Sequence, residues 1–258
     1  MSLPDANGLQ VMIARTLLFS LALPVLAAGS SVLASAAMAD AGEIRGVVEL
    51  FPSQGCSSCP PADAQLARLA GEDDVLALSY HVDYWNYLGW ADTLSSKAST
   101  ERQYGYARTL GRKNVYTPQA VINGEDHVNG ADGRAIDKLL GKLDSIGAGM
   151  VVDVSVDSDD DGLTISIGPG EGKADIVAVY FDRSNTVDIS RGENAGRTVT
   201  YHHSVRDMET VGMWNGEEIT LKLPASVISA HPDRSCAILL QIVGKDGAPG
   251  RILGAAKI

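Results

Sequence analysis

The chain has 258 residues, of which 32 are acidic and 21 are basic, so its formal net charge is −11 at pH 7. An acidic chain has no electrostatic attraction for nucleic acid and little for anionic lipid, so we expect neither as a partner. Apolar residues make up 45% of the composition, which is ordinary for a soluble globular protein.

Residues 1–39 have the pattern of a secretory signal peptide. Arg15 precedes an apolar segment from Thr16 to Ala28, and small residues follow up to Ala37-Met38-Ala39, the A-x-A pattern of a cleavage site. An uncleaved membrane anchor is the alternative, but the apolar segment is short for a span. We therefore expect a periplasmic or secreted protein with no stable membrane insertion after cleavage.

Residues 40–147 predict alternating strands and helices. Apolar runs predict the strands, and apolar residues at helical spacing between Gly, Pro and Asp predict the helices. The expected elements are a strand at 45–51, a helix from Pro60 and Pro61 to Gly71, a strand at 75–82, a helix at 100–110, strands at 119–122 and 127–129, and a helix from 132 or 133 with Ile136, Leu139, Leu140 and Leu143 in its core. This order, β-α-β-α-β-β-α, is that of the thioredoxin fold.

From Met150 onward the pattern changes to short strands with Gly, Asp and Pro turns. Such a pattern is typical of a β-sandwich. The predicted fold class is therefore an α/β thioredoxin-like domain, residues 40–147, followed by an all-β sandwich-like domain, residues 148–258. The strand-like runs are 151–156, 163–167, 174–181, 198–203, 218–223, 236–243 and 251–255.

The most informative motif is Cys56-Ser57-Ser58-Cys59, which follows the first strand and precedes Pro60 and Pro61. Proline suits the first turn of a helix, so the motif lies where a helix begins. The unpaired N–H groups and the positive dipole end of a helix start stabilise a thiolate and lower the pKa of Cys56. We expect Cys56 to attack a partner disulfide and Cys59, one turn further in, to resolve the mixed disulfide.

Thr117-Pro118 stands at the head of the strand at 119–122. Thioredoxin-like proteins place a cis-proline here, opposite the C-x-x-C, and the backbone before it can pair with an extended substrate. Pro118 and Thr117 are therefore predicted site residues, on the strength of their place in the predicted order. A purely structural disulfide and half of a zinc site are the alternatives for the two cysteines; no second C-x-x-C completes tetrahedral zinc.

His81, Asp83, Tyr84 and Trp85 follow the second predicted strand, at the edge of the sheet where Cys56 also lies. Ligands bind at this edge in open α/β sheets, so these four are candidate substrate-binding residues. His81 or Asp83 is a candidate proton shuttle for Cys59; the alternative is that both fasten the following loop by hydrogen bonds. The aromatic residues of the loop either line a groove for a partner or pack the loop itself.

Two features outside this region complete the set. The polar loop 192–197 is a candidate to reach back toward Cys56. Cys236 lies in an apolar run and reads as a buried thiol.

Four peptides extend the resemblance beyond the fold: VELFPSQGCSSCPPAD, LSYHVDYWNYLGWAD, TERQYGYARTLGRKNVYTPQAVING and, more loosely, GENAGRTVTYHHSVRDM. Over nearly all of residues 45–258 the chain resembles a secreted bacterial thioredoxin-like family catalogued as domain of unknown function 1223. Pro52 departs from the pattern, where we expect a threonine-type residue. The resemblance implies the fold and export, and assigns no activity.

We therefore expect an exported thiol–disulfide oxidoreductase that acts on protein or small-molecule disulfides. Its redox-active pair, Cys56 and Cys59, takes the place of a bound cofactor, and its partner is a protein thiol, a disulfide or an electron donor. Two alternatives use the same pair: a copper-binding assembly factor, with His127, His202 or His203 as a distal ligand for Cu(I), and a non-catalytic interaction module.

Overall fold

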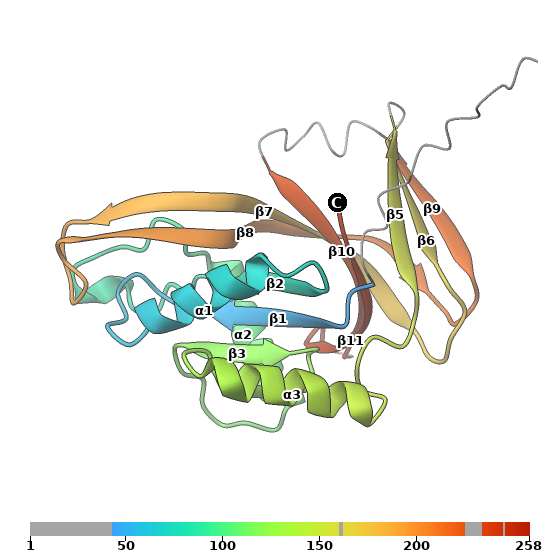
Figure 1. Cartoon of the computed structure of the whole chain (residues 1–258), viewed down its shortest axis with the longest axis horizontal. Coiled ribbons are helices and arrows are strands. Elements are labelled where there is room, and N and C mark those ends of the chain that lie inside the picture. Colours follow the sequence, from blue (N-terminus) through green and yellow to red (C-terminus); the bar gives the residue numbers. More distant parts are fainter. Residues whose placement is uncertain (1–42, 160–161, 225–233, 245) are drawn as a thin grey trace, which may run out of the picture. The chain divides into compact units, whose positions relative to one another are not determined.

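The computed structural model describes residues 43–159, 162–224, 234–244 and 246–258 (Figure 1); the predicted signal peptide, residues 1–39, lies outside them. Up to residue 145 the elements follow the predicted order. They are β1 (Gly46–Phe51), α1 (Pro60–Ala70), β2 (Val75–Ser79), a 3-10 helix (Asn86–Leu88), α2 (Lys97–Thr109), β3 (Gln119–Ile122), β4 (Asp126–Asn129) and α3 (Gly133–Ser145). Seven strands follow: β5 (Val154–Asp159), β6 (Gly162–Ile167), β7 (Ala174–Ile189), β8 (Arg197–Trp214), β9 (Ile219–Pro224), β10 (Ser235–Val243) and β11 (Pro249–Lys257).

The helix boundaries follow from local capping. In α3 the four predicted core residues are all buried, and the side chain of Asp132 caps the helix by accepting a hydrogen bond from the N–H of Ala135 at 3.0 Å. Helix α2 begins three residues before the predicted start, because Ser96 supplies a cap that accepts from the N–H of Ser99.

One mixed sheet joins strands from both halves of the chain. Its order is β11-β10-β7-β8-β2-β1-β3-β4, and a second sheet has the order β5-β6-β9. Strand β1 pairs parallel to β2 and antiparallel to β3. Strand β8 pairs with β2 where Ser204 lies opposite Ser79, so the strands after residue 147 continue the sheet begun before it.

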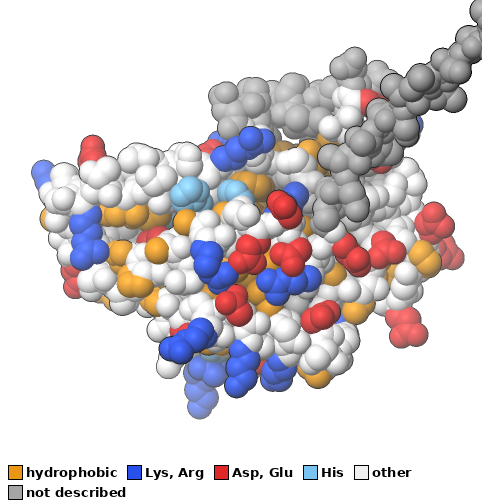
Figure 2. All heavy atoms as spheres, in the orientation of Figure 1, with side chains coloured by type: hydrophobic (Ala, Val, Ile, Leu, Met, Phe, Trp, Pro, Cys, Tyr) orange, Lys and Arg blue, Asp and Glu red, His pale blue; other side chains and the backbone are white. Residues whose placement is uncertain are grey.

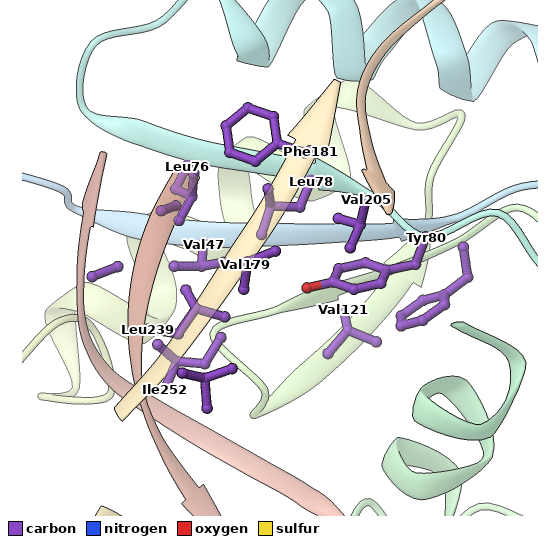
Figure 3. Close-up of a cluster of buried hydrophobic side chains, with 14 of the residues drawn as sticks. Val47, Leu76, Leu78, Tyr80, Val121, Val179, Phe181, Val205, Leu239 and Ile252 are labelled. Carbon is purple, nitrogen blue, oxygen red and sulfur yellow. The ribbon is translucent and has the colours of Figure 1, made fainter. Parts of the chain in front are cut away.

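The two halves also share a hydrophobic core. Val47, Leu76 and Leu78 from β1 and β2 pack with residues of β7, β10 and β11, including Val179 and Leu239 (Figure 3). A second core lies between α1, α3 and the opposite face of β1, β2 and β3. A third core joins the outer face of β7 and β10 to the β5-β6-β9 sheet.

The predicted fold class, an α/β thioredoxin-like domain followed by an all-β sandwich-like domain, is therefore wrong. Strands β7, β8, β10 and β11 extend the first sheet, and residues of β7, β10 and β11 pack over one face of β1 and β2; only β5, β6 and β9 form a separate sheet among the described residues. A signal was present in the sequence, because 174–181 is a nearly continuous apolar run, which is typical of strands buried on both faces. Two predicted short strands are also much longer, with 16 residues in β7 and 18 in β8.

The face that carries α1 and α3 has acidic and basic side chains interspersed (Figure 2). Arg45 and Arg68 lie among acidic residues there, with Arg45 paired to Asp74 at 2.6 Å and Arg68 to Glu72 at 2.6 Å. This face therefore presents no extended field of one sign. In the described part of the chain, no helix is both long enough and apolar enough to cross a membrane.

Candidate functional site

Cys56 and Cys59 form a disulfide in the turn between β1 and α1. The N–H of Cys56 donates to the carbonyl of Ser53, and the N–H of Cys59 donates to the carbonyl of Cys56, each at 3.1 Å. Cys59 is the N-cap of α1, and Pro60 and Pro61 occupy its first turn as predicted. The pair is thus fixed by the strand end on one side and by the helix start on the other.

The disulfide is well covered by protein. Cys56 is 3% exposed and Cys59 is completely buried, whereas Ser57 and Ser58 between them are exposed. Pro60 and Pro61 carry no N–H, so the first two residues of α1 offer no backbone donor to Cys56. The Ser58 hydroxyl lies 3.3 Å from the sulfur of Cys56, where it can donate a hydrogen bond to a thiolate.

The Thr117–Pro118 peptide bond is cis, and Pro118 is buried immediately before β3. A β-carbon placed on Gly130 would lie 3.3 Å from Ala62 and 3.6 Å from Pro118, which puts this proline beside the first turn of α1. Thr117 is half-buried, and its hydroxyl accepts a hydrogen bond from the Trp85 indole at 2.9 Å.

His81 lies just beyond β2 and is completely buried. Its Nδ1 lies 2.8 Å from Oδ2 of Asp92, and its ring contacts Tyr201 edge-on with the centroids 4.8 Å apart. Asp92 also accepts from the backbone N–H groups of Gln54 and Leu94. Burial acts to raise the pKa of Asp92, but His81 and these hydrogen bonds hold it below its ordinary value. The hydrogen bond to Asp92 orients the imidazole of His81 and directs Nε2 away from Asp92.

Asp63 is a residue of this site that the sequence analysis did not single out. It follows Cys59 by four residues, and its N–H donates to the carbonyl of Cys59 at 3.1 Å, so the two side chains lie on one face of α1. Burial raises the pKa of Asp63 to about 7, partly opposed by nearby His81. Among described residues, neither its Oδ1 nor Nε2 of His81 has a hydrogen-bond partner. The sequence feature that could have identified Asp63 is a carboxylate within the apolar stripe of a predicted helix.

The other predicted site residues secure the loop after β2. The carboxylate of Asp83 accepts from the hydroxyl of Thr100 at 2.6 Å, which ties the loop to α2. The hydroxyl of Tyr84 donates to Gln103 at 3.2 Å, and burial raises the pKa of Tyr84 to about 12. Asp83 and Tyr84 therefore bind α2, while His81 lies in a buried cluster with Asp63 and Asp92.

Two tryptophans pack against the loop that leads to Cys56. The indole of Trp90 donates to the side-chain carbonyl of Gln54 at 2.8 Å. A β-carbon placed on Gly55 would lie 3.3 Å from the β-carbon of Trp85. Tyr87, by contrast, is 78% exposed. The aromatic loop thus holds the cysteine turn in place and leaves the ring of Tyr87 on the surface.

The loop 192–197 reaches the cysteine turn, as the sequence suggested. The amide of Asn194 donates to the carbonyls of Gln54 and Cys56, each at 2.9 Å. The carboxylate of Glu193 accepts from the N–H of Ser57 at 3.2 Å. A segment more than 130 residues away in sequence therefore forms one wall of the site.

The three histidines proposed as distal copper ligands have other neighbours among the described residues. Nδ1 of His127 lies 2.9 Å from the hydroxyl of Tyr116, and Nδ1 of His203 lies 2.8 Å from the carbonyl of Ala77. His202 lines a cavity of about 550 Å³ beside His203 and Lys257. Within the described ranges, no group of three or more His, Cys, Asp or Glu residues is placed to hold a metal ion.

Comparison with known proteins gives relatives of similar structure. The crystal structure of a protein from Agrobacterium tumefaciens is 52% identical, with a TM-score of 0.78, and the match covers 84% of this chain and 95% of that one. HBP35 of Porphyromonas gingivalis is 16% identical, with a TM-score of 0.55 and coverage of 84% and 75%, a likeness that concerns the fold alone. No curated protein matches the chain.

A family model described as "Protein of unknown function (DUF1223)" matches residues 47–241. This range includes the cysteine turn, the buried cluster of His81 and the loop at Asn194. The chain therefore belongs to the DUF1223 family of proteins of unknown function.

Proposed function

We propose that the protein is an exported thiol–disulfide oxidoreductase whose redox pair is Cys56 and Cys59. The observation that carries the proposal is Asp63, a buried carboxyl one helical turn from Cys59 with a pKa raised to about 7. A disulfide that only staples a loop has no use for such a group, because a buried ionisable side chain lowers stability. A thiol that must lose a proton near neutral pH does have a use for it.

The proposed exchange runs in two steps. The thiolate of Cys56, stabilised by the Ser58 hydroxyl, attacks one sulfur of a partner disulfide. A Cys56–partner bond forms as the partner's S–S bond breaks, and the second partner sulfur leaves as a thiolate and takes up a proton. The reduced Cys59 then attacks Cys56, which forms the Cys56–Cys59 disulfide and releases the first partner sulfur as a thiol. Two electrons pass from the protein to the partner.

The buried cluster supplies the proton acceptor for the second step. The thiol of Cys59 transfers its proton to the carboxylate of Asp63 before it attacks. His81, oriented by its hydrogen bond to Asp92, interacts electrostatically with Asp63 and passes the proton on. In the reverse direction, Asp63 returns the proton to Cys59 when a partner thiol reduces the disulfide. Asp63, His81 and Asp92 are all buried, so this transfer is shielded from bulk water.

The test is catalysed reduction of insulin by dithiothreitol, with the thiol oxidation of a reduced peptide as the reverse assay. We expect Cys56→Ser and Cys59→Ser to lose at least tenfold of the catalysed rate. Cys236→Ser is the matched control, since Cys236 is a buried thiol of β10 whose pKa burial raises to about 11, and it should retain activity. Full activity in Cys56→Ser, or no catalysis by the unmodified protein in either assay, contradicts the proposal.

A further inference from the structure

The outer part of the β7–β8 hairpin is a two-stranded ribbon (Figure 1), and its end contacts the cysteine turn. Strand β7 pairs with β10 only between Asp175 and Phe181, and beyond Phe181 its partner is β8 alone. Strand β8 pairs with β2 at Ser204, next to His203, whose Nδ1 lies 2.8 Å from the carbonyl of Ala77 in β2. The residues between the paired ends Ile189 and Arg197 form the tip, residues 190–196, which lies against the cysteine turn.

Two side chains hold the tip in place. Asn194 is 2% exposed and donates to the carbonyls of Gln54 and Cys56, each at 2.9 Å. Glu193 accepts from the N–H of Ser57 at 3.2 Å. The other residues of the tip are exposed, and Gly192 packs beside Trp90, where a β-carbon on the glycine would lie 3.1 Å from that of Trp90.

The strength of this closure is modest. A two-stranded ribbon is marginally stable by itself, and a hydrogen bond of this kind contributes about 0.5–1.5 kcal/mol. Three side-chain hydrogen bonds and the packing of Gly192 beside Trp90 therefore hold the tip by a few kcal/mol, which permits opening without unfolding of the sheet. Opening is required for exchange, because Cys56 is 3% exposed in the closed form and the tip is bonded to the residues on both sides of it.

The closure also depends on the charge of Cys56. The disulfide is neutral, so in the oxidised protein the carboxylate of Glu193 faces no charge on Cys56. Reduction creates a thiolate at Cys56. The neighbouring residue, Ser57, already donates its N–H to the carboxylate of Glu193. Two anions at one helix start repel each other and compete for the same donors. The tip contacts are therefore weaker over the reduced pair than over the disulfide.

We propose that the tip, residues 190–196, is a redox-switched latch: Asn194 and Glu193 close it over the disulfide, and formation of the Cys56 thiolate releases it. The inference rests on the proposed function in that the same two cysteines change redox state during turnover. The latch shields the oxidised pair and exposes the reduced pair, so that Cys56 meets partner disulfides mainly when it can attack them.

Hydrogen exchange of a peptide spanning the tip, followed by mass spectrometry at pH 8, tests the latch. The protein is compared as purified and after reduction by dithiothreitol, which supplies two electrons and two protons and becomes a cyclic disulfide. We expect exchange in the tip to be about tenfold faster in the reduced protein. Asn194→Ala should exchange fast in both states, and Glu193→Gln, which keeps the acceptor but loses the charge, should exchange slowly in both.

Glu209→Gln is the matched control, an exposed carboxylate of β8 outside the tip, and it should behave like the unmodified protein. Equal exchange rates in the two redox states, or a redox difference that persists in Glu193→Gln, overturns the latch. The outcome is independent of the catalytic test: a latch that responds to reduction without catalysed exchange refutes the proposed function alone, and catalysis with a tip that does not respond refutes the latch alone.

Discussion

At the scale of single residues, the buried carboxyl of Asp63 lowers the free energy of unfolding when it ionises, and in the proposed function it accepts the proton of Cys59. Its carboxyl is buried, and no described residue bonds to its Oδ1. Its pKa lies at about 7 in the folded protein, against an ordinary value of 3.8. The folded state therefore holds a proton that the unfolded chain releases near pH 4. The stability associated with this proton is fully present below pH 4 and is lost as the pH rises to 7.

Asp63→Asn should raise stability and lower activity. The amide cannot ionise, so the free energy of unfolding of the variant does not fall between pH 4 and pH 8 on account of this residue. At pH 8 it should exceed that of the natural protein by on the order of 2–4 kcal/mol, with little difference at pH 4. Urea unfolding of the oxidised protein at both pH values measures this. The catalysed rate at pH 7 should fall about tenfold or more because Cys59 loses its proton acceptor.

Asp153→Asn is the control for that prediction, since Asp153 is an exposed carboxylate outside the site, and it should change neither quantity. An Asp63→Asn variant that is active and no more stable at pH 8 contradicts the role of Asp63.

From the sequence, the cysteines, Pro118 and His81 could be chosen by motif and position. Asp92 could not, because a carboxylate in an irregular loop gives no periodic signal of what it faces.

At the scale of elements, local patterns predicted what local forces decide. Pro60 and Pro61 start α1 because they fit a first helical turn, and the spacing of Ile136, Leu139 and Leu143 gives α3 its buried face. The length of β7 and β8 was not predictable in this way. Beyond Phe181 most of β7 is exposed or half-buried, and the ribbon is supported by contacts of β8 with α1 and by the tip contacts.

Contacts between elements decide other positions as well. Gly124 lies in the β3–β4 turn with φ of +66°, and a β-carbon there would lie 2.1 Å from the carbonyl oxygen of Gly250. The adjacent carbonyl of Asn123 accepts from the N–H of Ile252 at 2.9 Å. The turn can thus approach β11 closely only without a side chain. A glycine in a predicted turn indicated the conformation, and the close approach required the tertiary structure.

At the scale of the whole molecule, the shared core predicts that the two halves unfold together. Leu239 of β10 packs with Val47 and Leu76 of the first half (Figure 3). Leu239→Ala should therefore destabilise both halves, by about 2–5 kcal/mol. In a Trp214→Phe background, fluorescence comes from Trp85 and Trp90 of the first half alone. On Leu239→Ala, the urea midpoint measured by this fluorescence should fall together with the midpoint measured by circular dichroism. A fluorescence midpoint that Leu239→Ala leaves unchanged contradicts the shared core.

The sequence could not predict this sharing, because a strand pattern specifies which residues are buried and not which layer buries them. The continuous apolar runs of β7 and β10 indicated burial on two faces. They did not indicate that one of those faces covers β1 and β2. The same arrangement brings the β7–β8 ribbon to the cysteines, so the position of the latch depends on the long-range pairing of β8 with β2.

A redox titration of the Cys56–Cys59 pair tests the central claim most directly. The protein is equilibrated in thiol–disulfide buffers of graded potential, its free thiols are alkylated, and the modified fraction is measured by mass spectrometry. Exchange as a function predicts a midpoint within the range of known thiol–disulfide oxidoreductases, about −270 to −120 mV. A pair that stays oxidised below about −300 mV, as structural disulfides do, contradicts the claim.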